Sequence, residues 1–164
     1  MGQTGAKNSR RIFSSTMTSF DSERYSGRWY DVAHLPNSYQ LKCTSSVAFY
    51  IPQADGIYIA NYCISDSEVV DVIEGRGKAP DSEDPAKFLV KFKGVITDRA
   101  ANYWIYDTDY TSYSLVGDGT GTAFWILSRT HTMPARLYTT LVGKMRNWGY
   151  TPEKLVVNPI ALTA

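Results

Sequence analysis

The sequence predicts an all-β domain with one α-helix near its C-terminus, and three observations support this fold class. Short apolar segments with a two-residue period recur along the chain, separated by turn-forming Gly, Asp and Pro residues. Aromatic residues make up 13% of the 164 residues, and aromatic side chains pack well on pleated sheets. A four-residue apolar repeat appears only after Arg129. With 43% hydrophobic residues, a chain of this length is expected to form a single core.

Eight β-strands are expected, near residues 28–35, 43–51, 57–64, 69–78, 87–93, 102–107, 111–117 and 122–129. The segments "PQADG" and "GDGTG" between them supply Gly and Asp for hairpin turns. The alternation is plainest in "KFLVKF", where Phe88, Val90 and Phe92 share one face and Leu89 lies on the other. Short strands at regular spacing are typical of a barrel or a sandwich.

A helix is expected after the eighth strand. Every fourth residue is apolar there, which gives one apolar stripe: Met133, Leu137, Leu141 and Met145. Thr132 is expected to cap the helix, Pro134 suits its first turn, and Gly149 ends it near Trp148. The stripe is expected to pack on the sheet. The segment "EKLVVN" then predicts a short last strand at a sheet edge.

The first 20 residues are expected to form a basic arm outside the domain. They contain no apolar run of signal-peptide length, which favours an intracellular protein, cytoplasmic or membrane-associated through the arm. Gly2 follows the initiator Met and three basic residues precede the first acidic residue, so this stretch resembles a myristoylation signal, although Ala6 stands where the stricter pattern has Ser or Thr. An acyl chain with a basic patch would anchor the protein to a membrane surface; the alternative is a flexible polar arm.

Charge and motif content argue against several function classes. The net charge is +1 and the basic residues are scattered, so nucleic acid is not an expected partner. No metal-ligand spacing occurs, and "GDGTG" precedes a strand instead of the helix that a phosphate-binding loop needs. His34 and His131 are the only histidines, and neither has a nucleophile placed beside it by a motif. No catalytic residue, metal or cofactor is therefore expected.

Three separated stretches resemble the lipocalin family in order and spacing: "GRWY" at 27–30, "DTDYTSYSLV" at 107–116 and "FWILSR" at 124–129. The segments "LPNSYQLKC", "IEGRGKAP" and "DPAKFLVKF" are similar to the bacterial lipocalin and apolipoprotein D branch of that family. The resemblance spans about residues 20–158, and the domain is expected to cover 21–158, with a short tail at 159–164. It implies an eight-stranded antiparallel up-and-down β-barrel with the helix packed on its wall.

The resemblance also implies a function and its alternatives. The expected function is to bind or carry a small hydrophobic ligand in the barrel, most simply a fatty acid, a lysophospholipid or a similar lipid. One alternative is a structural or assembly protein that uses the outside of the barrel, with the arm docking it to a membrane or partner. A second alternative is an isomerase acting on a lipid or pigment.

In the lipocalin pattern one end of the barrel is plugged, since a cavity that holds an apolar guest out of water needs a sealed floor. The resemblance gives this role to Trp29, with Gly27 allowing the chain to pass close by and Arg129 lying across the outside of the ring. It places a turn at the same end, formed by Thr108, Asp109 and Tyr110, in which Asp109 bonds backbone amides.

Strand parity combined with the family register predicts the cavity lining: Val47, Phe49, Ala60, Tyr62, Val90, Phe92, Tyr103, Ile105 and Trp125. The alternative is that these side chains fill the barrel. The loop after the first strand would act as a lid, with Leu35, Tyr39 and Leu41 as candidates. Cys43 matches a family cysteine whose usual C-terminal partner is missing from "NPIALTA". A Cys43–Cys63 bond is conceivable between neighbouring strands, but two free buried thiols are favoured.

Overall fold

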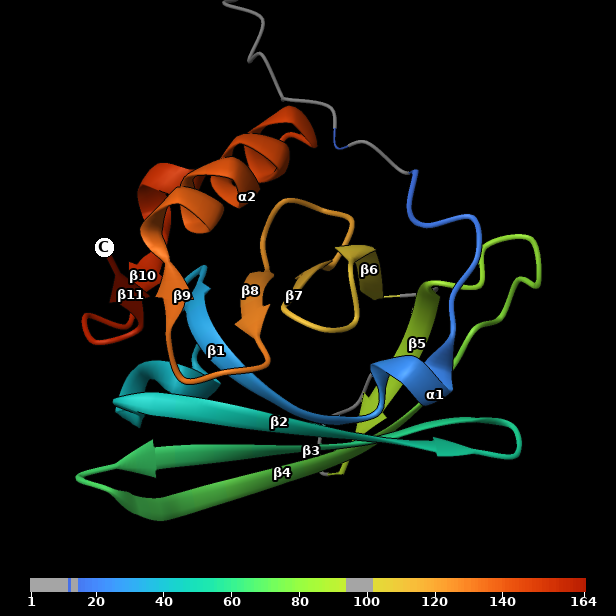
Figure 1. Ribbon diagram of the computed structural model, residues 1–164. Coiled ribbons are helices and arrows are strands. Elements are labelled where there is room, and N and C mark those ends of the chain that lie inside the picture. Colours follow the sequence, from blue (N-terminus) through green and yellow to red (C-terminus); the bar gives the residue numbers. More distant parts are fainter. Residues whose placement is uncertain (1–11, 13–14, 94–101) are drawn as a thin grey trace, which may run out of the picture.

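A computed structural model describes residues 12, 15–93 and 102–164, and its main feature is a closed antiparallel β-sheet (Figure 1). Each strand pairs with the next, and β1 also pairs with β8, which closes the ring. The ring strands are β1 (Gly27–His34), β2 (Ser45–Gln53), β3 (Gly56–Ser65), β4 (Glu68–Lys78), β5 (Lys87–Phe92), β6 (Tyr103–Thr108), β7 (Tyr113–Gly117) and β8 (Phe124–Ser128). All eight predicted strands are confirmed, with ends within two residues of the prediction.

Helix α2 (Ala135–Asn147) follows the ring, as predicted, but it begins differently from the expectation. Pro134 occupies the N-cap position and no side chain caps the helix, so the prediction that Thr132 caps it is wrong. The reason is a strand that precedes the helix: β9 (Met133–Pro134) pairs in parallel with β11 (Leu162–Thr163) and holds this backbone extended. Gly149, with φ of +99°, ends the helix as expected.

The remaining short elements flank the ring. Helix α1 (Ser22–Tyr25) leads into β1, and two short 3-10 helices follow β1 and α2: η1 (Tyr39–Lys42) and η2 (Pro152–Lys154). Strand β10 (Val156–Val157) pairs with the end of β1, beyond the residues of β1 that pair with β2. This confirms the short strand predicted in "EKLVVN", although β11 and not β10 is the last strand.

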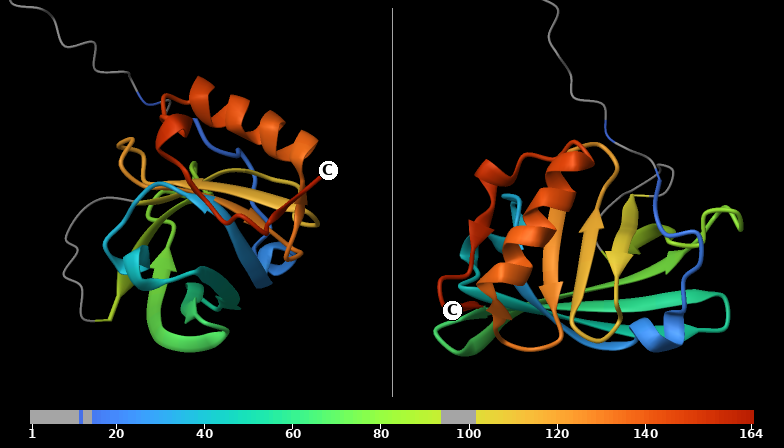
Figure 2. Two further views of the ribbon diagram at one scale, coloured as in Figure 1. Left: turned by 90° about the vertical axis from the view of Figure 1, so that its left-hand side faces the viewer. Right: turned by 45° about the horizontal axis from the view of Figure 1, so that its top comes forward.

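Two cores are built from opposite faces of the same strands. Inward side chains of the ring pack around Trp29, whereas outward side chains of β6–β8 pack beneath α2, where Leu141 and Met145 are buried. Figure 2 shows α2 lying across one side of the ring, with β2–β4 on the opposite side. The ring interior is therefore separate from the helix contact.

Candidate ligand-binding site

One end of the ring is sealed by Trp29. Its side chain is fully buried, and its indole Nε1 donates a hydrogen bond of 2.9 Å to the carbonyl oxygen of Tyr25 in α1. The Tyr25 ring lies 5.1 Å from the indole, centroid to centroid, and its hydroxyl bonds Ser114 of β7 at 2.8 Å. Because α1 supplies the floor beneath the indole, this end of the barrel is closed by packed aromatic side chains.

Arg129 covers the outside of the plug. Its guanidinium carbon lies 3.8 Å from the centre of the Trp29 ring, which is a cation–π contact. The guanidinium donates three hydrogen bonds of 2.9 Å to backbone carbonyls, those of Arg24, Arg28 and Tyr110. Gly27 has a φ of +97°, and a Cβ there would lie 3.5 Å from Arg129 Nη1. This conformation, which favours glycine, lets the chain turn into β1 beside the guanidinium.

The turn between β6 and β7 completes this end. Asp109 Oδ1 accepts backbone N–H bonds of 3.1, 2.8 and 3.0 Å from Thr111, Ser112 and Tyr113. The Thr108 hydroxyl donates to the Tyr113 carbonyl at 2.6 Å, and the Tyr110 hydroxyl accepts from the Asp21 amide at 3.0 Å. Burial opposes ionisation of Asp109, but the Ser112 hydroxyl and the three amides outweigh it and lower the pKa of the carboxyl. The ionised form therefore holds the turn.

Replacing Asp109 with alanine is expected to lower the free energy of unfolding by on the order of 1–3 kcal/mol at pH 7, because three amides lose a charged acceptor. The folded-state pKa of Asp109 is depressed, so its stabilising effect is present above the unfolded-state pKa and is lost as the pH falls through the folded-state pKa. Urea unfolding of both proteins from pH 7 to pH 3 measures this difference. A gap that stays constant across this range would contradict the assignment.

At the other end the ring encloses a cavity of about 390 Å³. Strands of the ring border it, together with the loop that follows β1. Its apolar and aromatic lining includes Val47, Ala48, Tyr50, Ile73, Val90, Phe92, Tyr103, Trp125 and Leu127. Burial raises the pKa values of Tyr50 and Tyr103 well above 10, so both hydroxyls are neutral and can donate. They hydrogen-bond to each other inside the barrel.

A polar cluster lies beside this apolar wall. The buried carboxylate of Asp31 accepts bonds from Gln40 Nε2 at 2.6 Å and from the Ser46 hydroxyl at 3.0 Å. Trp125 Nε1 donates to Gln40 Oε1 at 3.0 Å, which ties the cluster to β8. Asp31, Gln40, Ser46 and Trp125 all border the cavity. The site therefore combines a large apolar surface with a compact set of polar groups, as small-molecule sites do.

The structure places the predicted lining residues differently. Val90, Phe92, Tyr103 and Trp125 border the cavity, and Ile105 is buried in the core around Trp29. Val47 also borders the cavity, although its pairing with Tyr62 puts it in the outward-facing set of β2. The prediction is wrong for Phe49, Ala60 and Tyr62. Phe49 pairs with Ala60 and packs against the Tyr62 ring at 5.5 Å on the outer face, while Ala48 and Tyr50 take the inward positions of β2. Both sets of alternate residues in β2 contain apolar side chains, so the pattern did not fix which set faces inward.

The three lid candidates have different positions. Tyr39 in η1 borders the cavity, and its hydroxyl donates to the Asn61 carbonyl of β3 at 3.0 Å. Leu35 is buried beneath α2 instead, and Leu41 is 81% exposed, so neither side chain borders the cavity. Gln40, the loop residue at the centre of the polar cluster, was not predicted, because its partners Asp31 and Trp125 lie on β1 and β8.

A disulfide joins this loop to the barrel. Cys43 and Cys63 are bonded, with their Cα atoms 5.3 Å apart, so the expectation of two free thiols is wrong. Thr44 donates its amide to the Ile64 carbonyl at 2.8 Å, which brings the segment before β2 alongside β3 and puts the two cysteines within bonding reach. The disulfide fixes η1, and with it Tyr39 and Gln40, over the cavity.

Replacing both cysteines with serine is expected to lower the free energy of unfolding by about 2–4 kcal/mol, because the bond closes a loop between residues 20 apart in sequence. The effect on the structure should be local, with faster hydrogen exchange at the Gln40 and Cys43 amides than at those of β7 and β8. Exchange measured by NMR on both proteins gives the comparison. Two free thiols titrated in the denatured, unreduced wild-type protein would contradict the bond.

Neither histidine borders the cavity. His34 Nδ1 lies 2.9 Å from Asp31 Oδ2, on the side facing β10, and the exposed His131 ring packs 4.0 Å from the Tyr30 ring. In the part of the chain that the structure describes, no three metal-ligating side chains cluster, and no helix has the length and apolar character to span a membrane. Gly2 lies outside the described residues, and its acylation stays a prediction.

An eight-stranded ring with a sealed floor and an apolar interior defines a barrel that holds small hydrophobic molecules. A family model described as a lipocalin-like domain matches residues 20–160, and the chain belongs to the lipocalin family. Lipocalins bind small hydrophobic ligands and are generally binding or transport proteins.

Individual relatives agree with this assignment. Temperature-induced lipocalin-1 of Arabidopsis thaliana is 36% identical over 146 residues, which cover 84% of this chain and 77% of that protein. Apolipoprotein D of Mus musculus is 29% identical over 144 residues, covering 83% and 75%. The structure of insecticyanin from the tobacco hornworm Manduca sexta superposes with a TM-score of 0.68 at 20% identity, covering 88% of this chain and 83% of that one.

Proposed function

We propose that this lipocalin binds and carries a lipid with one long hydrocarbon chain, such as a fatty acid or a lysophospholipid. The observation that carries the proposal is the cavity of about 390 Å³, which falls within the usual size of small-molecule sites and is lined mainly by apolar and aromatic side chains. Each CH₂ group transferred from water to such a wall contributes about 0.8 kcal/mol, so a chain of many CH₂ groups supplies most of the affinity.

The polar cluster supports a defined orientation of the lipid. The hydrocarbon chain would extend along Tyr50, Val90 and Tyr103 toward the plug, and the polar head would stay near Gln40 and Asn61 at the loop. The head then remains close to the mouth, where it keeps contact with water or with neutral hydrogen-bonding groups. In this orientation the polar head is not buried in the apolar part of the barrel without hydrogen-bond partners, which would cost free energy.

Fluorescence titration tests the proposed function. Trp125 borders the cavity, so lysophosphatidylcholine and oleate are expected to change the tryptophan emission in a saturable way, with one molecule bound per chain. Lipids with shorter chains should bind more weakly, by about 0.8 kcal/mol per CH₂ removed. Absence of saturation with both lipids, below the concentrations at which they form micelles, would contradict the proposal.

We also propose that the protein acts inside the cell, on the support of the polar composition of residues 1–20. The disulfide is more typical of an oxidising compartment, so the two features make opposite predictions. Intact mass measurement of the protein from its own cells distinguishes the two locations. An acyl group on Gly2 would support an intracellular location, and a processed N-terminus would oppose it.

A further inference from the structure

The outer face of β2–β4 carries apolar side chains where a barrel normally exposes polar ones. The strand register aligns Ile51 with Tyr58 and Arg76, and it aligns Tyr62 with Val72. A Cβ at Gly75 would lie 2.8 Å from the Phe92 ring at the cavity wall, so the alternate positions of β4 on either side of it face outward. Ile51 is 53% exposed, Val72 41% and Phe49 36%. These side chains form a continuous apolar surface on adjacent strands.

A basic surface borders the apolar one. Arg76 of β4 pairs with Lys91 of β5, so both side chains lie on the outer face. A groove of about 800 Å³ on this face is bordered by four cations: Arg76, Lys78, Lys91 and Lys93. Two of them have acidic partners, since Lys78 lies 3.2 Å from Asp55 and Lys93 lies 2.8 Å from Glu74. Arg76 and Lys91 make no ion pair within the described residues. The groove therefore has a net positive charge beside an apolar surface.

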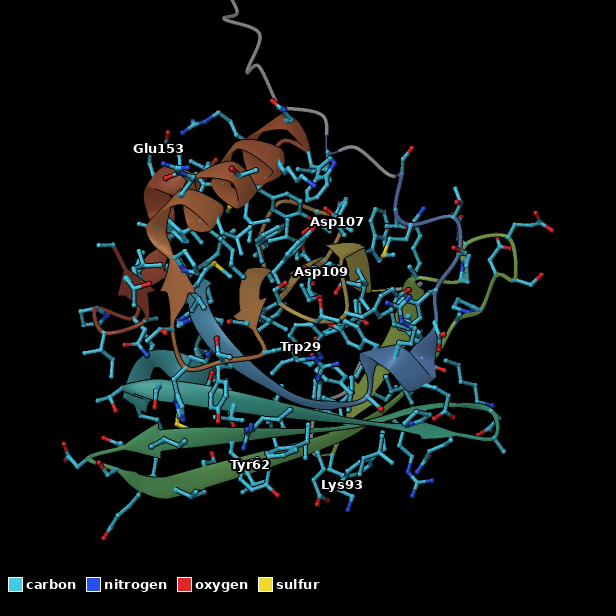
Figure 3. The ribbon with its side chains drawn as sticks, viewed as in Figure 1. Trp29, Tyr62, Lys93, Asp107, Asp109 and Glu153 are labelled. Carbon is cyan, nitrogen blue, oxygen red and sulfur yellow. A yellow bond between two sulfur atoms is a disulfide. The ribbon has the colours of Figure 1, made fainter. Side chains whose placement is uncertain are left out.

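No described helix covers this face. In Figure 1, α2 lies on the opposite side of the ring from β2, β3 and β4. Figure 3 shows the side chains of Tyr62 and Lys93 on the side of these strands that faces away from Trp29. Contiguous exposed apolar side chains on a soluble domain mark an interaction surface. The face is thus free to approach a flat partner without displacing any part of the described fold.

We propose that this outer face, defined by Phe49, Ile51, Tyr62, Val72 and the four cations, docks on a bilayer that contains anionic phospholipids. Apolar and aromatic side chains enter the interface between headgroups and acyl chains, and neighbouring Lys and Arg side chains bind the phosphates. A second copy of this chain is a poorer partner because the acidic groups on this face, Asp55 and Glu74, already pair with its own lysines. None of these docking residues borders the cavity, although Phe92 borders both the cavity and the groove, and the proposal does not depend on the proposed ligand.

Vesicle co-sedimentation tests the proposal, using the full chain with an unmodified Gly2. The protein is expected to bind vesicles of equal parts phosphatidylcholine and phosphatidylserine, to bind vesicles of phosphatidylcholine alone much more weakly, and to be released by high salt. The double variant Arg76→Glu with Lys91→Glu should lose at least about tenfold in affinity for the anionic vesicles. The variant Ile51→Ser with Val72→Ser should also bind more weakly, without a change in charge.

The control is Arg136→Glu, which reverses one cation, half the charge change of the double variant, at an exposed position of α2 on the far side of the barrel and should leave binding unchanged. Circular dichroism and thermal unfolding of each variant exclude a loss of fold. Equal binding of the wild type and the Arg76/Lys91 variant would overturn the proposal, because the basic N-terminal residues would then account for the vesicle binding. Absence of vesicle binding by the wild-type protein, or a dimer that Ile51→Ser dissociates, would overturn it as well.

Discussion

Replacing Trp29 with alanine is expected to lower the free energy of unfolding by about 3–5 kcal/mol, more than the loss expected for Asp109→Ala. The fully buried indole would leave a void at the sealed end of the ring. The Tyr25 carbonyl would lose its donor, and Arg129 would lose the ring it covers at 3.8 Å. For a domain of this size, the melting temperature should fall by roughly 10 °C. Urea and thermal unfolding measure both quantities.

Trp125→Ala is the matched control because it removes the same side chain from the other end of the barrel. Its ring borders an open cavity and is only partly buried, so the free energy of unfolding should fall by less than half as much as for Trp29→Ala. Its effect should fall on ligand affinity instead. Equal losses of stability for the two variants would contradict the assignment of Trp29 as the plug.

Replacing Ala48 with phenylalanine is expected to weaken lipid binding by at least about tenfold, because the new ring would occupy the cavity volume that the hydrocarbon chain needs. The same substitution also tests whether the cavity is open. In a barrel filled by its own side chains, the added ring would cost typically about 1–3 kcal/mol of stability, whereas an open cavity accepts it at lower cost. Lipid titration and urea unfolding of the same variant give the two results.

Ala60→Phe is the control for this substitution. Ala60 pairs with Phe49 on the outer face of the neighbouring strand, so the same added ring would lie outside the cavity and leave lipid affinity within about twofold. A loss of affinity in Ala60→Phe that equals the loss in Ala48→Phe would show that the inward and outward positions of β2 and β3 are assigned the wrong way round.

Sequence patterns suffice to predict the inward residues only where a strand alternates clearly. In β5, one alternate set of "KFLVKF" is wholly apolar and the other contains both lysines, and Val90 and Phe92 border the cavity. In β2 both alternate sets contain large apolar side chains, with Tyr50 inside and Phe49 and Ile51 outside. A change of parity by one residue moves every side chain of a strand to the other face. Strand parity combined with the family register therefore predicts Phe49 inside, whereas the structure has Phe49 on the outer face.

Long-range contacts account for the other differences. The Cys43–Cys63 bond, the Gln40 contact with Trp125, and the pairing of β11 with β9 join segments that are distant in sequence. No local pattern encodes such contacts. The plug was predictable because "GRWY" and "FWILSR" resemble a family pattern, and that resemblance, instead of spacing alone, placed Arg129 against Trp29.

The measurement that tests the central claim most directly is native mass spectrometry of the full-length protein purified gently from its own cells, followed by denaturation of the same sample. A carrier function predicts one extra mass of lipid size on the folded chain, held in the cavity of about 390 Å³ and released on denaturation. The released molecule would then identify the ligand. A folded protein that carries no such mass, and that takes up none when incubated with lysophospholipid or fatty acid, would contradict the carrier function.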